Sequence, residues 1–236
     1  MDDARFPRTW RQRAVIVPAA RALGLWFRPR VHGLDAVPRR APVVYVGKHP
    51  RSWLYLEVML LALLTFWDED RVPFRPMEKR GTSLHRLPGL GWVRRHVGAI
   101  PATERAALAA LAGGESVLLF PGGARELHGA RDAVAWRGRE GFARIAARAG
   151  VPIVPLAIAG ADHQHPLALR LGKRATLWLP PVPLPVPLDF WFGDPIAPAD
   201  AGDPEGIAAC AASARSATQA LLDRAAARRR PLWSLR

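Results

Sequence analysis

The chain has 236 residues, half of them hydrophobic, so it can bury one sizeable core but is too short for two comfortable domains. Its 34 Lys and Arg residues outnumber 20 acidic residues, and the net charge of +14 attracts anionic lipid or nucleic acid. A single cysteine, Cys210, excludes an intramolecular disulfide and two-cysteine metal motifs.

The first predicted element is a basic amphipathic helix over residues 9–27, which Pro18 is expected to kink or divide. Such a helix can lie flat among lipid headgroups, or it can cover the main domain. Residues 1–30 are therefore treated as an amphipathic N-terminal helical segment and residues 31–236 as the main domain. The longest apolar run, 53–67, is interrupted by Glu57 and is shorter than the roughly 20 residues of a membrane span. With no signal-peptide pattern either, we expect a peripheral protein on the cytoplasmic side.

In the main domain, predicted strands alternate with predicted helices. This alternation is typical of a single α/β domain with a mostly parallel central sheet flanked by helices. The run 180–187 contains five prolines and is expected to be an extended connector. The predicted strands cover 43–46, 74–77, 116–120, 152–158, 175–179 and 188–192, and the predicted helices cover 52–66, 103–111 with Thr103 as its cap, 138–149 ended by Gly150, and 203–229.

The first candidate site is the segment Gly47–Glu57, which follows the buried strand at 43–46. Parallel α/β sheets bind ligands at the carboxyl ends of their strands, so His49 is expected at the mouth of the sheet. Pro50 favours an extended conformation for His49 and keeps it out of the following helix. A carboxylate beside a histidine orients the imidazole and raises its basicity, so His49 and Glu57 form a candidate pair for deprotonating a hydroxyl. A purely structural loop histidine is the alternative.

The second candidate segment is 120–126, Phe-Pro-Gly-Gly-Ala-Arg-Glu, at the same edge of the sheet. Gly122 and Gly123 let backbone amides approach a ligand closely. Arg125 offers a planar guanidinium to a phosphate or carboxylate, and Glu126 could bind a hydroxyl or hold Arg125. A glycine turn with a surface ion pair is the alternative.

Two further segments carry weaker signals. Residues 98–105 lead into a helix whose N-terminus can hold an anion near Arg105. Asp162, His163 and His165 could bind a metal, but no further cluster lies beside them, and we interpret them as a polar loop. The absence of a Gly-x-Ser-x-Gly elbow and of a Walker phosphate loop disfavours the hydrolases and nucleotide-binding proteins that carry those motifs.

Taken together and in this order, these segments resemble the glycerolipid and lysophospholipid acyltransferase superfamily, the family of 1-acylglycerol-3-phosphate acyltransferases. The block at 120–126 reads Pro-Gly-Gly-x-Arg-Glu in place of Pro-Glu-Gly-Thr-Arg, which looks most like the mono- and diacylglycerol acyltransferase and phytyl-ester-synthase branch. The matching segments are Val31–Pro38, His49 with the residues after it, Gly98–Arg105, Phe120–Glu126, Val151–Pro155 and Phe192–Ile196.

The resemblance implies transfer of a fatty acyl group from acyl-CoA or acyl carrier protein to a lipid hydroxyl at a membrane surface, with no metal or redox cofactor. His49 would be the base and an acidic residue would hold its imidazole. Arg105 and Arg125 would bind anionic parts of donor or acceptor. Lys48, Gly122, Gly123 and Glu126 complete the predicted substrate-binding set.

The sequence departs from the family pattern at two positions. The family's aspartate would fall at position 54, which is Leu54, and the nearest acid is Glu57, about one helical turn later. We hypothesise that Glu57 substitutes for the aspartate. Lys48 stands where the family usually has Asn, and its charge would lower the pKa of His49 and keep the base neutral.

The alternative function is a non-catalytic pseudo-enzyme that binds anionic membrane lipid or nucleic acid through its charge. The three arginines at 228–230 suit that alternative. Nucleic acid is the less favoured partner, because the chain carries no nucleic-acid-binding signature.

Overall fold

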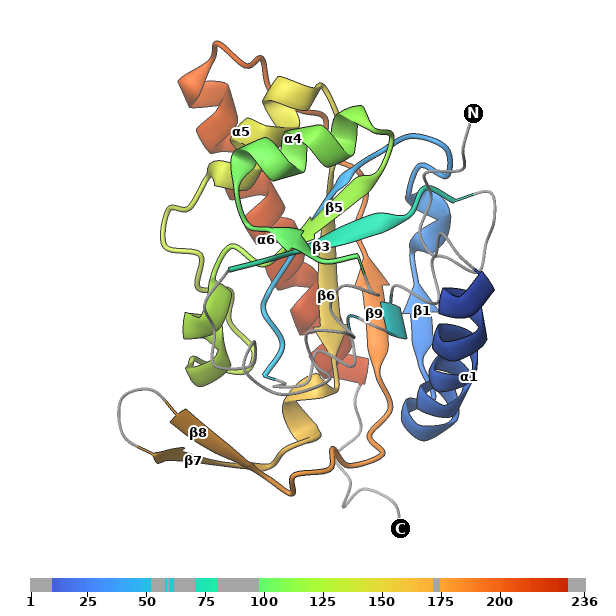
Figure 1. The fold of residues 1–236 in the computed structure, drawn as a ribbon. Coiled ribbons are helices and arrows are strands. Elements are labelled where there is room, and N and C mark those ends of the chain that lie inside the picture. Colours follow the sequence, from blue (N-terminus) through green and yellow to red (C-terminus); the bar gives the residue numbers. More distant parts are fainter. Residues whose placement is uncertain are drawn as a thin grey trace.

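The computed structural model describes residues 10–51, 58, 60–61, 71–79, 98–171 and 175–228. Figure 1 shows these elements in a single α/β arrangement with a central sheet. The helices are α1 (Trp10–Phe27), α4 (Glu104–Ala112), α5 (Gly141–Ala149) and α6 (Pro204–Arg228), with short 3₁₀ helices η1 (Leu34–Ala36), η3 (Gly123–His128) and η4 (Ala161–His163). The strands are β1 (Arg30–His32), β2 (Val44–Gly47), β3 (Phe74–Glu78), β4 (Ile100–Pro101), β5 (Ser116–Leu119), β6 (Ile153–Ala159), β7 (Leu167–Leu171), β8 (Ala175–Leu179) and β9 (Asp189–Phe192).

The central sheet has the strand order β1-β9-β6-β2-β5-β3-β4. Every pairing in it is parallel except that of β6 with β9. Strand β2 lies between β6 and β5, so the chain that leaves β2 is flanked by the segments that leave those two strands. The expected single α/β domain with a mostly parallel sheet is confirmed.

Both faces of the sheet are covered by a hydrophobic core. The side chains of β2 alternate between the two faces, so neighbouring residues of this strand belong to different cores. Val44 and Val46 pack in the core formed with α4, α5 and α6, whereas Tyr45 packs in a second core on the other face. This second core includes Phe27, which is fully buried at the end of α1. Helix α1 lies beside β1 in Figure 1.

Most predicted elements are present close to their expected bounds. Thr103 caps α4 by accepting the N–H of Ala106 at 3.3 Å, and Gly150 ends α5 in the left-handed conformation at φ 65°. Helix α1 continues through Pro18 and is not divided there. Of the helix predicted over 52–66, only residues 58, 60 and 61 belong to the described part of the chain, and all three are helical.

Three short strands differ from the sequence-based expectation. β1 and β4 have three and two residues, too few to produce a recognisable pattern. The third is β7, which pairs with β8 in a separate two-stranded sheet (Figure 1), so β8 is not part of the central sheet. Local pairing with the segment just before it explains why 175–179 is extended without joining the larger sheet.

Candidate active site

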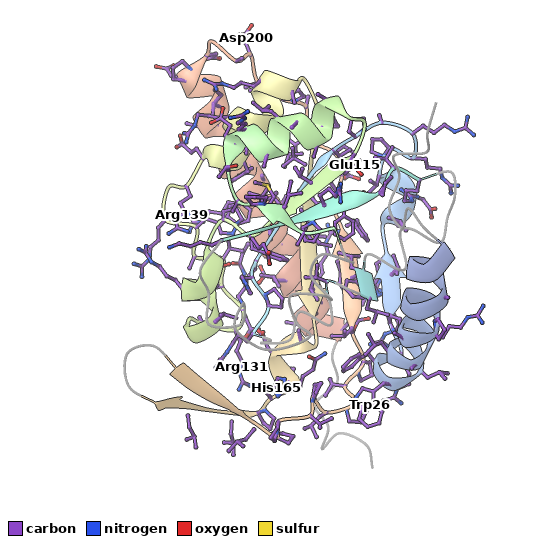
Figure 2. All side chains as sticks on the ribbon, in the orientation of Figure 1. Trp26, Glu115, Arg131, Arg139, His165 and Asp200 are labelled. Carbon is purple, nitrogen blue, oxygen red and sulfur yellow. The ribbon has the colours of Figure 1, made fainter. Side chains whose placement is uncertain are left out.

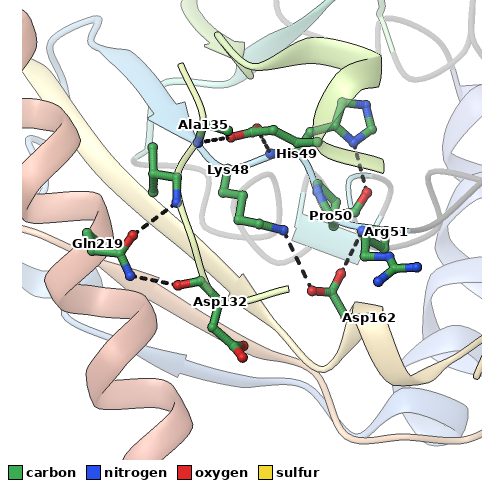
Figure 3. Close-up of polar contacts among 10 residues, drawn as sticks. Lys48, His49, Pro50, Arg51, Asp132, Ala135, Asp162 and Gln219 are labelled. Carbon is green, nitrogen blue, oxygen red and sulfur yellow. Dashed lines mark hydrogen bonds and ion pairs between the residues drawn. The ribbon is translucent and has the colours of Figure 1, made fainter. Parts of the chain in front are cut away.

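The loop that leaves β2 is held between two carboxylates, one from the segment that follows each neighbouring strand (Figure 3). Glu126, in η3 after β5, accepts the backbone N–H of His49 at 2.7 Å. Asp162, in η4 after β6, accepts the backbone N–H of Arg51 at 2.7 Å. Because an ionised acceptor forms a stronger hydrogen bond than a neutral one, these two contacts fix the path of the loop on both sides of Pro50.

The His49 side chain is 5% exposed and its ring lies 5.1 Å from that of Phe120. Its Nδ1 is 2.8 Å from the carbonyl oxygen of Pro50. A carbonyl oxygen can only accept, so in the neutral ring Nδ1 carries the hydrogen and Nε2 carries the lone pair. The ring is therefore in the tautomer that a general base acting through Nε2 requires.

Burial lowers the pKa of His49 from 6.5 to about 4. The hydrogen bond to the Pro50 carbonyl raises the pKa, the positive charge of Lys48 lowers it, and the negative charge of Asp162 raises it. The predicted effect of Lys48 therefore has the right direction, but burial is the main cause. The imidazole is neutral at pH 7 and able to accept a proton.

Lys48 is buried and its Nζ lies 3.6 Å from the Asp162 Oδ2. Asp162 thus binds the loop twice, through the Arg51 N–H and through the Lys48 ammonium (Figure 3). The sequence pattern favours a polar loop at Asp162 over a metal site and gives Asp162 no part in the active site. A carboxylate shortly after a buried parallel strand was the available signal, because such a position lies at the same edge of the sheet as His49.

Gly122 leaves the space that the Glu126 side chain occupies. A Cβ at position 122 would lie 2.0 Å from the Glu126 carboxyl carbon, closer than any real contact. Gly122 has φ −64° and ψ −29°, which any residue can adopt, so the need for glycine is steric. The second Glu126 oxygen accepts the N–H of Ala135 at 2.8 Å, and burial raises the pKa of the Glu126 carboxyl against these hydrogen bonds.

The segment that carries Ala135 is itself held by α6 and by an arginine. Gln219 accepts the N–H of Val134 at 2.9 Å and donates to the carbonyl of Asp132 at 2.7 Å (Figure 3). Arg139 donates to the carbonyl of Pro121 at 2.6 Å. The hydrogen-bonded support of His49 therefore extends from η3 to the far helix of the fold, and neither Gln219 nor Arg139 has a recognisable signal in the sequence.

The remaining predicted site residues lie at the same edge of the sheet or outside the described part of the chain. Arg125 in η3 and Arg105 in α4 are exposed, and neither forms an ion pair with another described residue. Strand β4, which precedes Arg105, is three strand spacings from β2, roughly 14 Å. Gly123 begins η3 with φ 58°. Glu57 and Leu54 are outside the described residues.

Within the described ranges, no group of three or more His, Cys, Asp and Glu side chains is arranged to hold a metal ion. Asp162 is engaged with Lys48 and Arg51, and His165 Nδ1 contacts the Pro180 carbonyl at 2.8 Å. No helix in this part of the chain is both long and apolar enough to cross a bilayer.

A neutral, buried histidine at the carboxyl end of the second sheet strand, beside a glycine-rich block after the fifth, is the arrangement expected of an acyltransferase. The acyltransferase family model matches residues 28–159, more than half of the chain, and the chain belongs to this family. It is a member of the glycerolipid acyltransferase superfamily that the motifs resemble.

Individual relatives agree with this assignment. Phytyl ester synthase 1, chloroplastic, of Arabidopsis thaliana is 36% identical over 147 residues, covering 59% of this chain and 20% of that protein. An uncharacterised protein of Mycobacterium tuberculosis is 29% identical over 196 residues, covering 74% of this chain and 54% of that protein. The chain thus spans between a fifth and about half of the length of these relatives.

A solved structure shares the fold. The crystal structure of PlsC, the 1-acyl-sn-glycerophosphate (LPA) acyltransferase of Thermotoga maritima, superposes with a TM-score of 0.62 at 19% identity. The match covers 93% of this chain and 83% of that one, so it includes the sheet and the helices around it.

Proposed function

We propose that this chain transfers a fatty acyl group from a thioester donor, acyl-CoA or acyl carrier protein, to the hydroxyl of a glycerolipid or lysophospholipid at a membrane surface. The observation that carries the proposal is the His49 tautomer, in which Nδ1–H is bound by the Pro50 carbonyl and Nε2 holds the lone pair. The low pKa of His49, about 4, keeps this base neutral under physiological conditions.

In the proposed reaction, Nε2 of His49 takes the proton of the acceptor hydroxyl as that oxygen attacks the thioester carbonyl carbon. The C–O bond forms, the C–S bond breaks, and the imidazolium returns the proton to the departing thiolate. The only co-substrate is the acyl thioester, and no metal or redox group takes part in these steps. The charged loop contacts from Glu126 and Asp162 hold the base in place throughout.

Arg125 and Arg105 are proposed to bind the anionic parts of the acyl donor and the acceptor. Both guanidiniums are exposed at the edge of the sheet where His49 lies, and their planar forks suit phosphate oxygens. Glu57 is proposed as the acidic partner of His49 and takes the place of the family aspartate. The single cysteine suits a reducing compartment, and we place the enzyme at the cytoplasmic face of the membrane.

The test is an acyl-transfer assay with acyl-CoA or acyl carrier protein and a panel of acceptors, including lysophosphatidate, diacylglycerol and phytol. We expect wild type to esterify at least one acceptor and His49→Ala to lose about 10²- to 10⁴-fold in kcat while its thermal unfolding stays cooperative. Full turnover by a folded His49→Ala protein would refute the mechanism. If wild type shows no turnover, and if His49→Ala binds vesicles and DNA as well as wild type does, the non-catalytic alternative is favoured.

A further inference from the structure

Six of the seven large hydrophobic side chains that the described residues expose belong to three neighbouring segments. The segments are the end of α1, the proline-rich connector 180–187 between β8 and β9, and strand β7 of the hairpin. The exposed fractions are 82% for Leu25, 66% for Val182, 59% for Leu167, 52% for Leu169, 45% for Trp26 and 39% for Leu184. Isolated exposed hydrophobics are common on proteins, but a cluster of this size indicates a contact surface.

Hydrogen bonds join the three segments into one surface, which we name the apolar rim. The indole Nε1 of Trp26 donates to the carbonyl of Pro183 at 3.0 Å, so α1 is bound to the connector. The N–H of Leu184 donates to the carbonyl of Gln164 at 3.0 Å, so the connector is bound to the segment that precedes β7. Figure 2 shows Trp26 and His165 at the same end of the molecule, and Figure 1 shows the connector running between the hairpin and α1.

The connector has almost no unsatisfied backbone N–H groups that would lose hydrogen bonds to water in an apolar environment. Five of its eight residues are prolines, which have no backbone N–H. The N–H groups of Leu184 and Val186 are bonded to the carbonyls of Gln164 and Leu184, which leaves only Val182 with a donor not satisfied within the described chain. Irregular backbone is normally excluded from lipid because of its unsatisfied polar groups, and this segment largely avoids that cost.

The charge of these segments selects the partner. Residues 4–34 contain seven arginines and residues 163–188 contain three Lys or Arg residues, and neither stretch contains a single Asp or Glu. Arg28 is exposed and donates to the carbonyl of Pro185. An apolar surface whose segments carry an excess of cations is complementary to a bilayer that contains anionic lipid. Trp26 has the apolar ring and satisfied N–H typical of a membrane interface.

We propose that the apolar rim, formed by the end of α1, the proline connector and β7, inserts into an anionic lipid bilayer and turns the active site toward it. The rim begins beside the site: Asp162 binds the His49 loop, and two residues later the Gln164 carbonyl binds the connector. Membrane contact at the rim therefore brings the lipid headgroups to the edge of the sheet where Nε2 accepts a proton. The orientation part of this inference rests on the proposed function, but membrane binding by the rim does not.

The test is co-sedimentation of the full chain with vesicles of phosphatidylcholine alone and of phosphatidylcholine with phosphatidylglycerol. The variant Leu167→Ala/Leu169→Ala removes two exposed neighbours on one face of β7. We expect its affinity for the anionic vesicles to fall by about tenfold or more, because each leucine loses most of its apolar burial in the bilayer. Leu167→Glu/Leu169→Glu should bind still more weakly. Ala109→Glu/Ala112→Glu is the matched control, because it adds the same charge at exposed positions of α4 and should lose much less.

The same variants are assayed for acyl transfer with vesicle-borne acceptor and with a short-chain acceptor below its critical micelle concentration. The rim variants should lose turnover of the vesicle-borne acceptor and keep turnover of the dispersed one. If wild type turns over neither acceptor, the proposed function fails, and the sedimentation result still decides membrane binding. Unchanged vesicle affinity in the leucine variants would overturn the proposal. The proposal would also be overturned if wild type were a dimer in sedimentation equilibrium, and if the leucine substitutions dissociated this dimer without altering vesicle binding.

Discussion

The Glu126 carboxylate accepts the backbone N–H of His49 at 2.7 Å, and the space it occupies exists because residue 122 is glycine. We predict that Gly122→Ala destabilises the fold by about 1–3 kcal/mol, because the new Cβ overlaps the Glu126 side chain. Shortening that side chain in Gly122→Ala/Glu126→Ala should relieve the overlap. Urea denaturation of the two single variants and the double variant measures the coupling. Additive losses would show that the two positions do not share one space.

The pH dependence of stability should report the buried His49. Its pKa is about 4 in the folded protein and 6.5 when unfolded, so the unfolded chain binds a proton first as the pH falls. The stability tied to this group is fully present above pH 6.5 and is lost between pH 6.5 and 4, by about 3 kcal/mol. His49→Gln should lack this part of the acid destabilisation when denaturation is compared at pH 7 and pH 4.5. The acid limb of kcat/KM should likewise lie near pH 4 and not near 6.5.

Lys48 and Asp162 should move that acid limb in opposite directions. Lys48→Asn removes a positive charge that lowers the pKa of His49, so the limb should shift to higher pH. Asp162→Asn removes a negative charge that raises it, so the limb should shift to lower pH. The pH profile of kcat/KM distinguishes these effects from simple loss of structure, which would scale the whole profile without moving it.

Glu57 is tested by a conservative pair of variants. If its carboxylate holds the His49 imidazole, Glu57→Gln should lower kcat with little change in KM, and Glu57→Ala should lower it further. Because the Pro50 carbonyl already binds Nδ1, we expect both losses to be smaller than that of His49→Ala. Equal and full activity in both Glu57 variants would remove Glu57 from the mechanism and leave the family assignment intact.

Asp189 should hold β1 to β9 at the edge of the sheet. Its buried carboxylate contacts Arg30 Nε at 2.7 Å and Nη2 at 2.8 Å, and His32 Nε2 at 3.3 Å. The Arg30 side chain is 60% exposed, so solvent weakens the ion pair, and we predict that Asp189→Asn costs only about 1–2 kcal/mol. Thermal unfolding measures the loss, and Asp194→Asn at an exposed position provides the comparison.

Local patterns were sufficient for the longer elements and for the position of His49. The buried strand before it and the proline after it place the histidine at the edge of the sheet in both sequence and structure. The contacts that hold it were not predictable in the same way. His49 and Glu126 are separated by 77 positions, and Arg51 and Asp162 by 111, so no local pattern joins them. The sequence predicts a substrate-binding role for Glu126 and gives no sign that both its oxygens accept backbone N–H groups.

The apolar rim could not be predicted from the sequence for a related reason. In the sequence, the N-terminal helix and the proline run are separate features, one a candidate membrane helix and the other a stiff connector. The hydrogen bonds from Trp26 to Pro183 and from Arg28 to Pro185, each spanning 157 positions, show that they form one surface.

The pairing of β1 with β9 also constrains the order in which the chain can assemble. Arg30 and Asp189 lie 159 positions apart, so this edge of the sheet cannot close on the ribosome until nearly everything between them has been synthesised. During that interval Leu25 and Trp26 have no connector to contact, although they are already outside the exit tunnel. Leu25 and Trp26 therefore stay exposed to chaperones and to lipid for as long as the 157 positions between Trp26 and Pro183 take to be synthesised.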